Sequence, residues 1–332
     1  MAVVMLEGFD HLSNTQYPSK GWAGVLLNAP VAGSLGGQAV RVSGAVTTRN
    51  LPATYSTLIA GFRFRTVSQL NTGRDYFVLK SGATLVCRLQ FALVGADTVF
   101  RLLNSAGTTL GTGTFPIVTN TWMYLEIKCV VSATVGQVEL RINGTTVDIT
   151  TAASLNTGSS NLDAVQLGNV SGTNFDYDDV YVVDTSGSAP TNTWLGDSRV
   201  ETLAPDGNGA STAWTGVYTD IDDSTSHDSD TTYINSSTPG DRETATLSAL
   251  AVGTGTVYAV QANVVARKDD AGSRTIAPVL RISGTNYDGT TTAGLGTDYT
   301  DYTQLYDRLD PVGNAWSIAT VNAMEAGVKE VA

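Results

Sequence analysis

The sequence predicts an all-β chain of two β-sandwich, jelly-roll-like domains with one short C-terminal helix. Two observations support this fold class. Apolar and polar residues alternate in many short runs, which is the period of a strand with one buried face. Turn residues separate these runs at regular spacing, and only one stretch has a helical period. Many short strands in this arrangement are typical of a sandwich or a barrel.

The clearest strands lie within residues 121–150. Every second residue from Met123 to Val131 is apolar, and a similar alternation returns at 137–143. Asn143-Gly144 then separates two apolar runs. This dipeptide favours a type I′ hairpin turn, because both central positions of that turn require φ > 0. A third strand follows the turn. Three antiparallel strands with one apolar face need a second sheet to cover that face.

The rest of the first half contains shorter strand signals bounded by glycine and serine turns. We expect strands at 3–9, 39–42, 45–48, 56–65, 76–79, 85–93, 98–103, 164–167 and 178–183. These strands supply the two sheets of the first predicted sandwich.

The second half begins after a small-residue, proline-containing stretch at 186–192. Further strands are expected at 243–250, 256–267, 275–283 and 300–305. The run at 256–267 has few polar residues on either face, which predicts a central strand covered on both sides. Ser317 is a suitable N-cap for a helix at 317–326, with Gly327 at its C-terminal end. A last edge strand is predicted at 328–331.

These patterns divide the chain into a β-sandwich at 1–190, a linker or joining strand at 191–204, and a second β-sandwich at 205–332. Small residues and proline at 186–192 offer little side chain to bury, which favours a boundary there.

Composition narrows the function. Lys+Arg 19 against Asp+Glu 31 gives a formal net charge of -12, which disfavours nucleic acid and anionic membrane surfaces as partners. We expect no membrane insertion and no signal peptide, and therefore synthesis in a cytoplasm without export. Cys87 and Cys129 lie in apolar runs and are expected to be buried small hydrophobes. Whether they pair stays open, since pairing requires neighbouring strands.

Two resemblances appear in the chain. The run W-x-Y-x-E-x-K…G-x-V-E-L-R-x-N-G, from Trp122 to Gly144, resembles the concanavalin A-like (laminin-G-like) jelly roll of lectins and glucanases. Residues 266–289 and 310–331 resemble the C-terminal domain of two-domain tailed-bacteriophage virion proteins, in which a segment like 194–200 joins the two domains. The resemblance implies a virion structural protein made in the host cytoplasm.

From this resemblance we expect a non-enzymatic structural or adhesive component, associated with the tail as fibre, baseplate or adhesin. Other virion proteins, further copies of the same chain and host-surface glycans are the expected partners. The second domain is expected to serve particle assembly. A head or collar decoration protein and a carbohydrate-binding module not tied to a particle are the alternatives.

Catalysis is not expected. Glycoside hydrolysis needs two carboxylates flanking the scissile bond, and no glutamate stands in the E-x-D-x-E or E-x-D-x-x-E pattern of family-16 glycosidases. Glu126 and Glu139 are expected on exposed strand faces. His11 and His227 are expected at the surface, and no serine lies in a G-x-S-x-G context. The two histidines and two cysteines do not match a zinc site.

Calcium is the one cofactor that the sequence suggests, because a hard cation takes six to eight oxygen ligands and acidic loops supply them. The candidate ligands fall in two clusters: Asp176 and Asp178 in the first, and Asp220, Asp222, Asp228 and Asp230 in the second. A glycan would instead stack on exposed aromatic rings. The candidate glycan-binding residues are Tyr218, Tyr233, Tyr287, Tyr299 and Tyr302.

Overall fold

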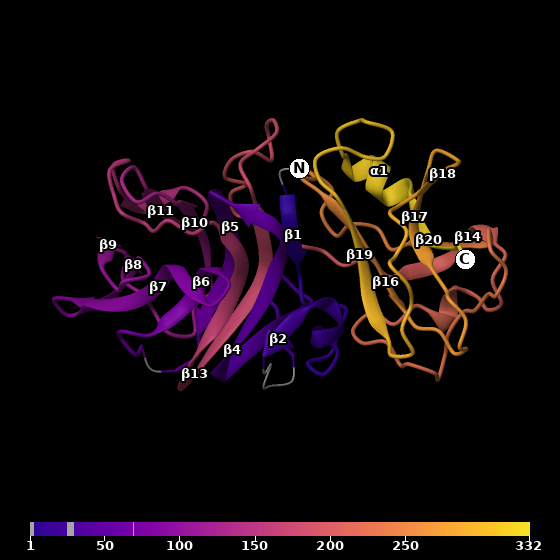
Figure 1. Cartoon of the computed structure of the whole chain (residues 1–332), viewed down its shortest axis with the longest axis horizontal. Helices are drawn as coiled ribbons and strands as arrows, with labels where there is room; N and C mark the ends of the chain where they lie inside the picture. The colour runs from indigo at the N-terminus through magenta and orange to yellow at the C-terminus, as the bar shows by residue number, and fades with distance from the viewer. Residues whose placement is uncertain (1–2, 25–29, 69) are drawn as a thin grey trace. The chain divides into compact units, whose positions relative to one another are not determined.

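The computed structural model describes residues 3–24, 30–68 and 70–332 and confirms the all-β prediction. Its described residues form antiparallel sheets and one short α-helix, α1 (Figure 1). The chain divides into two compact units, Met1–Phe9 with Ser13–Val200, and Asp10–Leu12 with Glu201–Ala332. The division after Val200 falls inside the predicted linker or joining strand at 191–204.

The described residues of unit 1 form one branched sheet whose main path runs β12-β11-β10-β5-β13-β6-β7-β8-β9. Strands β1 to β4 join this sheet through β13 and β4. The elements of unit 1 are β1 (Val3–Glu7), the 3-10 helix η1 (Tyr17–Lys20), β2 (Trp22–Gly24), β3 (Val31–Ala32), β4 (Gln38–Tyr55), β5 (Thr57–Thr66), β6 (Asp75–Ser81), β7 (Thr84–Val94), β8 (Asp97–Leu103), β9 (Thr109–Thr112), β10 (Met123–Val130), β11 (Gln137–Ile142), β12 (Thr146–Thr150) and β13 (Leu162–Val183).

The long strand β13 connects the two layers of this sandwich. Its first part pairs with β6, its last part pairs with β5, and β4 follows it along most of its length. The sequence predicts separate short strands for β4 and β13, which are continuous here. Gly168 permits the bend in β13, because its φ is 85° and a Cβ would collide with Val42.

The core of unit 1 shows that the sheet closes on itself. Phe64 of β5 packs against Phe91 of β7 and Phe100 of β8, with ring centroids 6.2 and 6.3 Å apart. These strands are not neighbours in the sheet, so their contact is across two facing layers. In each of these strands, every second side chain counted from Phe64, Phe91 or Phe100 therefore points inward, and the side chains between them point outward.

The predicted hairpins are confirmed. Strands β10, β11 and β12 are consecutive antiparallel neighbours. Asn143 and Gly144 have φ values of 52° and 84°, as a type I′ turn requires. Cys87 and Cys129 are buried free thiols, which confirms their interpretation as small hydrophobes.

Unit 2 contains a five-stranded sheet in the order β14-β15-β20-β17-β18 and a two-stranded sheet of β16 and β19. Its elements are β14 (Pro205–Thr212), the 3-10 helix η2 (Tyr218–Asp220), β15 (Arg242–Leu247), β16 (Val260–Ala266), β17 (Ile276–Ile282), β18 (Thr285–Asp288), β19 (Thr300–Tyr306), α1 (Ile318–Ala323) and β20 (Glu325–Glu330).

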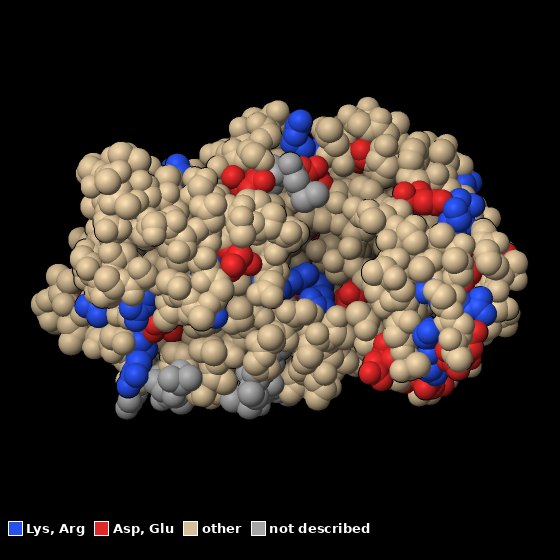
Figure 2. All heavy atoms as spheres, viewed as in Figure 1, with Lys and Arg blue, Asp and Glu red and all other residues tan. Residues whose placement is uncertain are grey.

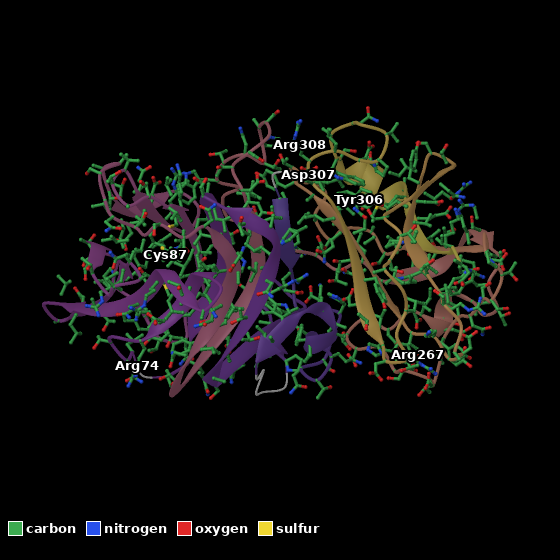
Figure 3. The ribbon with its side chains drawn as sticks, in the orientation of Figure 1. Arg74, Cys87, Arg267, Tyr306, Asp307 and Arg308 are labelled. Carbon is green, nitrogen blue, oxygen red and sulfur yellow. The ribbon has the colours of Figure 1, made fainter. Side chains whose placement is uncertain are left out.

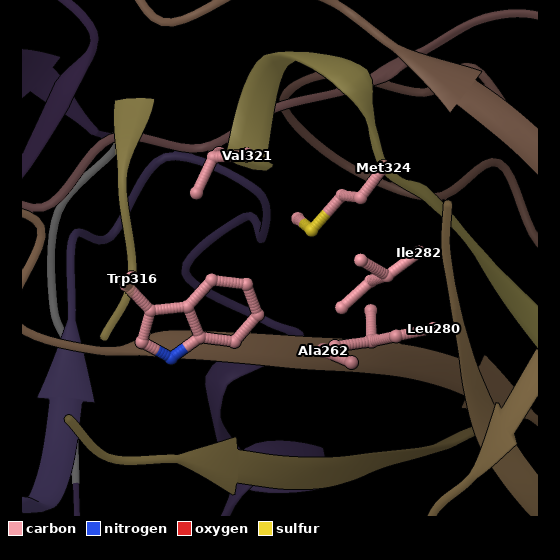
Figure 4. Close-up of a cluster of buried hydrophobic side chains, with 6 residues drawn as sticks. All are labelled: Ala262, Leu280, Ile282, Trp316, Val321 and Met324. Carbon is pink, nitrogen blue, oxygen red and sulfur yellow. The ribbon is translucent and has the colours of Figure 1, made fainter. Parts of the chain in front are cut away.

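A small apolar cluster holds the layers of unit 2 together (Figure 4). It is formed by Ala262 of β16, Leu280 and Ile282 of β17, and Trp316, Val321 and Met324 from the α1 region. The Ser317 side chain accepts a 3.0 Å hydrogen bond from the Thr320 amide, so the predicted N-cap is confirmed.

Three expectations for unit 2 are wrong. The run at 256–267 is not a central strand, because the part that forms a strand, β16, pairs only with β19. The C-terminal strand is not an edge strand, since β20 pairs with both β15 and β17. The helix ends at Ala323, and Gly327 lies within β20. A Cβ on Gly327 would collide with the Glu243 carbonyl, so close strand approach accounts for this glycine.

Candidate functional site

Glu126 does not lie on an exposed face, and that expectation is wrong. Its side chain on β10 is 0% exposed, whereas Glu139 on β11 is half-buried and accepts a 2.7 Å bond from Arg141. Glu126 Oε1 accepts hydrogen bonds from the Tyr181 hydroxyl and, at 2.9 Å, from the Gly196 amide. Burial raises the pKa of Glu126 above its ordinary value of 4.5, while the bonds from Tyr181 and Gly196 oppose the rise.

Residues 194–200, which we call the strap, cover this face of the sheet. Arg63 donates to Asp179 and Asp197 at 2.8 and 2.5 Å, and the Val200 amide donates to Asp179 at 2.6 Å. The guanidinium of Arg141 lies 4.2 Å from the ring centroid of Trp194. The segment predicted to join two domains is thus bonded to the first of them.

The packing under the strap is close. A Cβ on Gly61 would collide with the Tyr181 ring and the Tyr124 hydroxyl, so only glycine fits beneath these two tyrosines. Glu126 Oε2 is buried and has no hydrogen-bond partner among the described residues. Bonded and enclosed in this way, Glu126 holds the strap and is not accessible to a substrate.

The first predicted calcium cluster is occupied by protein groups. Asp176 is fully buried and receives bidentate bonds from Arg41 at 2.7 and 3.0 Å, and further bonds from Arg65 at 2.9 and 2.6 Å. Asp178 accepts the Ser34 amide at 2.9 Å and the Asp179 amide at 2.8 Å. These carboxylates stabilise the sheet and an adjacent loop.

The second cluster is spread along a loop of unit 2. Asp220 accepts the Val217 amide at 2.9 Å, Asp228 accepts the Thr232 amide at 3.1 Å, and Asp222 is exposed. Within residues 3–24, 30–68 and 70–332, no three His, Cys, Asp or Glu side chains form a group suited to a metal. Calcium binding stays a prediction.

Two predicted residues do meet, namely Tyr299 and Asp230. The Tyr299 hydroxyl donates to Asp230 at 2.8 Å, and Arg267 donates to the same carboxylate at 2.7 Å. The bond from Arg267 has the larger effect and lowers the pKa of Asp230, and the bond from Tyr299 lowers it further. The Tyr299 ring also packs against His227 and Arg267, with centroid distances of 5.1 and 5.3 Å. Its ring is therefore engaged by protein side chains.

The other predicted tyrosines lie on separate elements. Tyr218 is in η2, Tyr287 is on β18 against the apolar cluster, and Tyr302 is on β19. Tyr233 is 52% exposed. The histidines are less exposed than expected: His227 is half-buried, and burial lowers its pKa, while the His11 side chain is 12% exposed and lies 3.3 Å from Asp301.

Sequence analysis also missed a group of linked polar side chains in unit 1. On the outward side of β6, β7 and β8, hydrogen bonds link four side chains into what we call the polar row: Asp75, Arg88, Gln90 and Arg101. Arg88 donates two hydrogen bonds to the Asp75 carboxylate, at 2.9 and 3.0 Å. Gln90 donates to Asp75 at 2.7 Å and accepts from Arg101 at 3.2 and 2.7 Å.

Strand register creates this row. Asp75 is paired with Gln90, and Gln90 with Arg101, so the three side chains stand side by side on one face. Phe91 and Leu89 point into the aromatic core, which directs Gln90 and Arg88 away from it. The alternation in β7 could have indicated this outward polar face, but the partner strands and their register could not be read from it.

A shallow groove lies beside the start of β6. The alternation along β7 puts its Leu93 on the side of Leu89 and Phe91, opposite to Gln90. Leu70, Asn71, Thr72, Arg74 and Leu93 line the groove, and its volume is about 430 Å³. This lies within the roughly 300–1,000 Å³ of small-molecule sites. Arg74 directly precedes Asp75, and Leu93 is 66% exposed. We call these five residues the Arg74 groove.

Basic side chains gather in this region of an acidic chain. Figure 2 shows Lys and Arg at the lower left, over the strands labelled β6–β8 in Figure 1 and the loop below them. In Figure 3, Arg74 lies at the lower edge of unit 1 as drawn, below the buried Cys87. The groove therefore offers a guanidinium and an amide, from Arg74 and Asn71, beside the exposed Leu93, which suits a polar ligand with an apolar face.

No protein-family model matches the chain, and no curated protein matches it in sequence. Solved structures similar to it include a cellulose-induced protein, Cip1 (TM-score 0.40, 14% identity, covering 54% of this chain and 95% of that chain). Another is domain 4 of AbnA, an extracellular arabinanase from Geobacillus stearothermophilus in complex with arabinotriose (0.40, 15%, 55% and 93%). A third is the CBM2 module of Lactobacillus casei BL23 phage J-1 evolved Dit (0.37, 11%, 56% and 98%). Because each TM-score lies below 0.5, these similarities do not define the function of this chain.

The described part of the chain contains no helix that is long and apolar enough to cross a membrane.

The buried Glu126 gives a testable pH dependence. Because burial raises its pKa, the folded protein binds this proton more tightly than the unfolded chain. Ionisation of Glu126 therefore lowers the free energy of unfolding as the pH rises above 4.5. Glu126→Gln keeps an acceptor for Tyr181 and Gly196 without the charge. Urea denaturation should show the stability of the variant relative to wild type increasing between about pH 4 and pH 7.

Glu139→Gln is the matched control, because the same change is made on the neighbouring strand at a half-buried side chain. Its difference from wild type should vary less with pH. A difference for Glu126→Gln that stays constant over this pH range would contradict the buried-carboxyl account.

Proposed function

We propose that this chain is a non-enzymatic structural or adhesive component of a tailed-phage particle that contacts carbohydrate through the Arg74 groove. The observation that carries the carbohydrate contact is the groove itself, in which the polar side chains of Asn71, Thr72 and Arg74 stand beside the exposed Leu93. Carbohydrate hydroxyls require fixed donors and acceptors, and side chains already held by one another lose little freedom on binding.

The geometry of Asn71 supports this preorganisation. Its side-chain amide donates a 2.7 Å hydrogen bond to the Thr173 hydroxyl, and its backbone carbonyl accepts a hydrogen bond from the Tyr76 hydroxyl. The orientation of the Asn71 side chain is thus fixed before a ligand arrives. Leu93 adds an exposed apolar wall on which the CH face of a sugar ring can rest.

The particle part of the proposal rests on the resemblance of 194–200, 266–289 and 310–331 to two-domain virion proteins. A tail position, as fibre, baseplate or adhesin, agrees with a carbohydrate-contacting surface. Assembly with other virion proteins and with further copies of the chain belongs to the same proposal. In this account the carboxylates Glu126 and Asp176 have structural roles, because protein groups engage them.

A glycan array with the full chain tests the carbohydrate part. We expect binding to at least one glycan series, weakened about fourfold by Leu93→Ala, because the contact of roughly one methylene is lost. Leu93 is 66% exposed, so the folded state should tolerate the change. Tyr233→Ala is the control in unit 2 and should bind like wild type. If Tyr233→Ala removes binding and Leu93→Ala does not, the site lies in unit 2.

Immunogold labelling of particles tests the position. Gold should collect at the tail. Label confined to the head or collar would favour a decoration protein, and unlabelled particles would favour a carbohydrate-binding module that is not tied to a particle.

A further inference from the structure

The strap lies on unit 1 in the way that a bound peptide lies on a receptor. All of its residues are described, and they form neither a helix nor a strand. Side chains of the sheet instead accept hydrogen bonds from its main chain. Tyr181 accepts one from the Leu195 amide at 3.3 Å, and Glu126 accepts one from the Gly196 amide at 2.9 Å. Main-chain bonds hold an extended segment in place, while the contacts of its side chains select its sequence.

The successive residues from Trp194 to Asp197 each match the face beneath them. Trp194 lies against a guanidinium of β11, and Leu195 is buried. Gly196 has a φ of 76°, a conformation that favours glycine. Asp197 accepts a 2.5 Å hydrogen bond from Arg63 of β5. The face therefore suits an aromatic residue, an aliphatic residue, a glycine and an acidic residue in that order.

A β-bulge contributes to this face. The register of β13 against β5 shifts between Asp178 and Tyr181, and Asp179 within the bulge has a φ of 52°. This conformation is uncommon for a residue with a side chain. The Asp179 carboxylate accepts the Val200 amide of the strap at 2.6 Å and Arg63 at 2.8 Å. Bulges often redirect a side chain beside a functional site, and here the redirected side chain binds the strap.

We infer that this face of β5, β10 and β13 is a peptide-binding site, and that it can bind the strap of a second copy of the chain in place of its own. The inference rests on the proposed assembly with further copies of the chain and names the segment that joins them. The strap of a second copy would make the same contacts, because its sequence is identical. This match favours a copy of the chain over an unrelated protein. Exchange of identical segments between two copies closes a symmetric dimer.

The segment before the strap is long enough for such an exchange. Residues 184–193 connect the end of β13 to the strap, and these described residues form no helix or strand. Residues 186–190 within this segment are all exposed. An extended chain gains about 3.3–3.6 Å per residue, so the segment can span up to about 35 Å. This length is comparable with the diameter of a small domain.

Concentration decides between the two arrangements, because both use the same contacts. A short flexible connection presents the strap to its own face at an effective concentration on the order of 1 mM. A second copy competes with it when the concentration of the chain approaches this value. Dilute chains therefore keep their own straps, and copies crowded together in a particle exchange them.

The experiment uses the full chain and a fluorescein-labelled peptide with the sequence of residues 193–201. In a strap variant of the chain, Trp194→Ser, Leu195→Ser and Asp197→Ser together remove the competing contacts and leave the face unchanged. Fluorescence anisotropy should show that the peptide binds the strap variant at least about tenfold more tightly than wild type, because the wild-type strap competes with it. A scrambled peptide of the same composition is the control and should bind neither chain.

Two altered peptides test the selectivity of the face. The Gly196→Ala peptide should bind about tenfold more weakly, because a Cβ is unfavourable at a positive φ. The Asp197→Asn peptide should also bind about tenfold more weakly, because it loses the charge-assisted bond from Arg63.

Hydrogen–deuterium exchange of wild type gives a readout that does not depend on how the strap variant folds. Excess unlabelled peptide should displace the resident strap. The amides of Gly196 and Val200 in the chain should then exchange faster, because they lose their bonds to Glu126 and Asp179.

Light scattering tests whether copies of the chain exchange straps. Dimers of wild type should appear as its concentration rises toward about 1 mM, and excess unlabelled peptide should dissociate them. The strap variant should stay monomeric at the same concentrations.

Several results would overturn the inference. A peptide that binds neither chain and leaves wild-type exchange unchanged, or that binds no better than its scrambled control, would show that the face is not a peptide-binding site. Wild type that stays monomeric at these concentrations would refute exchange between copies, and dimers of the strap variant would place the interface elsewhere. The glycan array and the gold label are independent of these results, so the proposed carbohydrate contact and tail position are tested separately.

Discussion

The pairing of β4 with β13 is the constraint on which unit 1 depends. Because β13 pairs with β6 at one end and with β5 at the other, it fixes how the two layers face each other. The aromatic contacts of Phe64 with Phe91 and Phe100 follow from that arrangement. It also leaves two outward faces with different chemistry: the face of β10 and β5 is closed by the strap, while the face of β6–β8 carries the polar row.

Charge placement distinguishes these two faces. Under and beside the strap, Asp176 and Asp179 are each matched by arginines, and the Glu126 carboxyl is enclosed. A buried carboxylate needs such partners, because removing it from water without them is costly. On the other face, Arg101 is bonded to an amide instead of a carboxylate. The first arrangement stabilises the fold, whereas in the second the Arg101 guanidinium is bonded to a neutral amide oxygen.

Local patterns allowed the strands and turns to be predicted, but not how they associate. The turn at Asn143-Gly144 could be predicted because a type I′ turn needs residues that tolerate φ > 0. The burial of Glu126 could not be predicted, because the strap that covers it is distant in the sequence. The prediction of a central strand at 256–267 was wrong, because apolar residues on both faces do not show how many neighbours a strand has. In the structure β16 pairs with a single strand, β19. The polar row was missed for the same reason, since register brings Asp75 beside Gln90 and Arg101.

Hydrogen–deuterium exchange of the full chain, with and without the glycan that binds most tightly, tests the central claim most directly. If the ligand occupies the Arg74 groove, amides of 70–75 and around Leu93 should exchange more slowly in its presence. The loop at 218–233 and the residues around Tyr299 should not change. Protection confined to that loop, with unchanged exchange at 70–75, would contradict the account and place the ligand in unit 2.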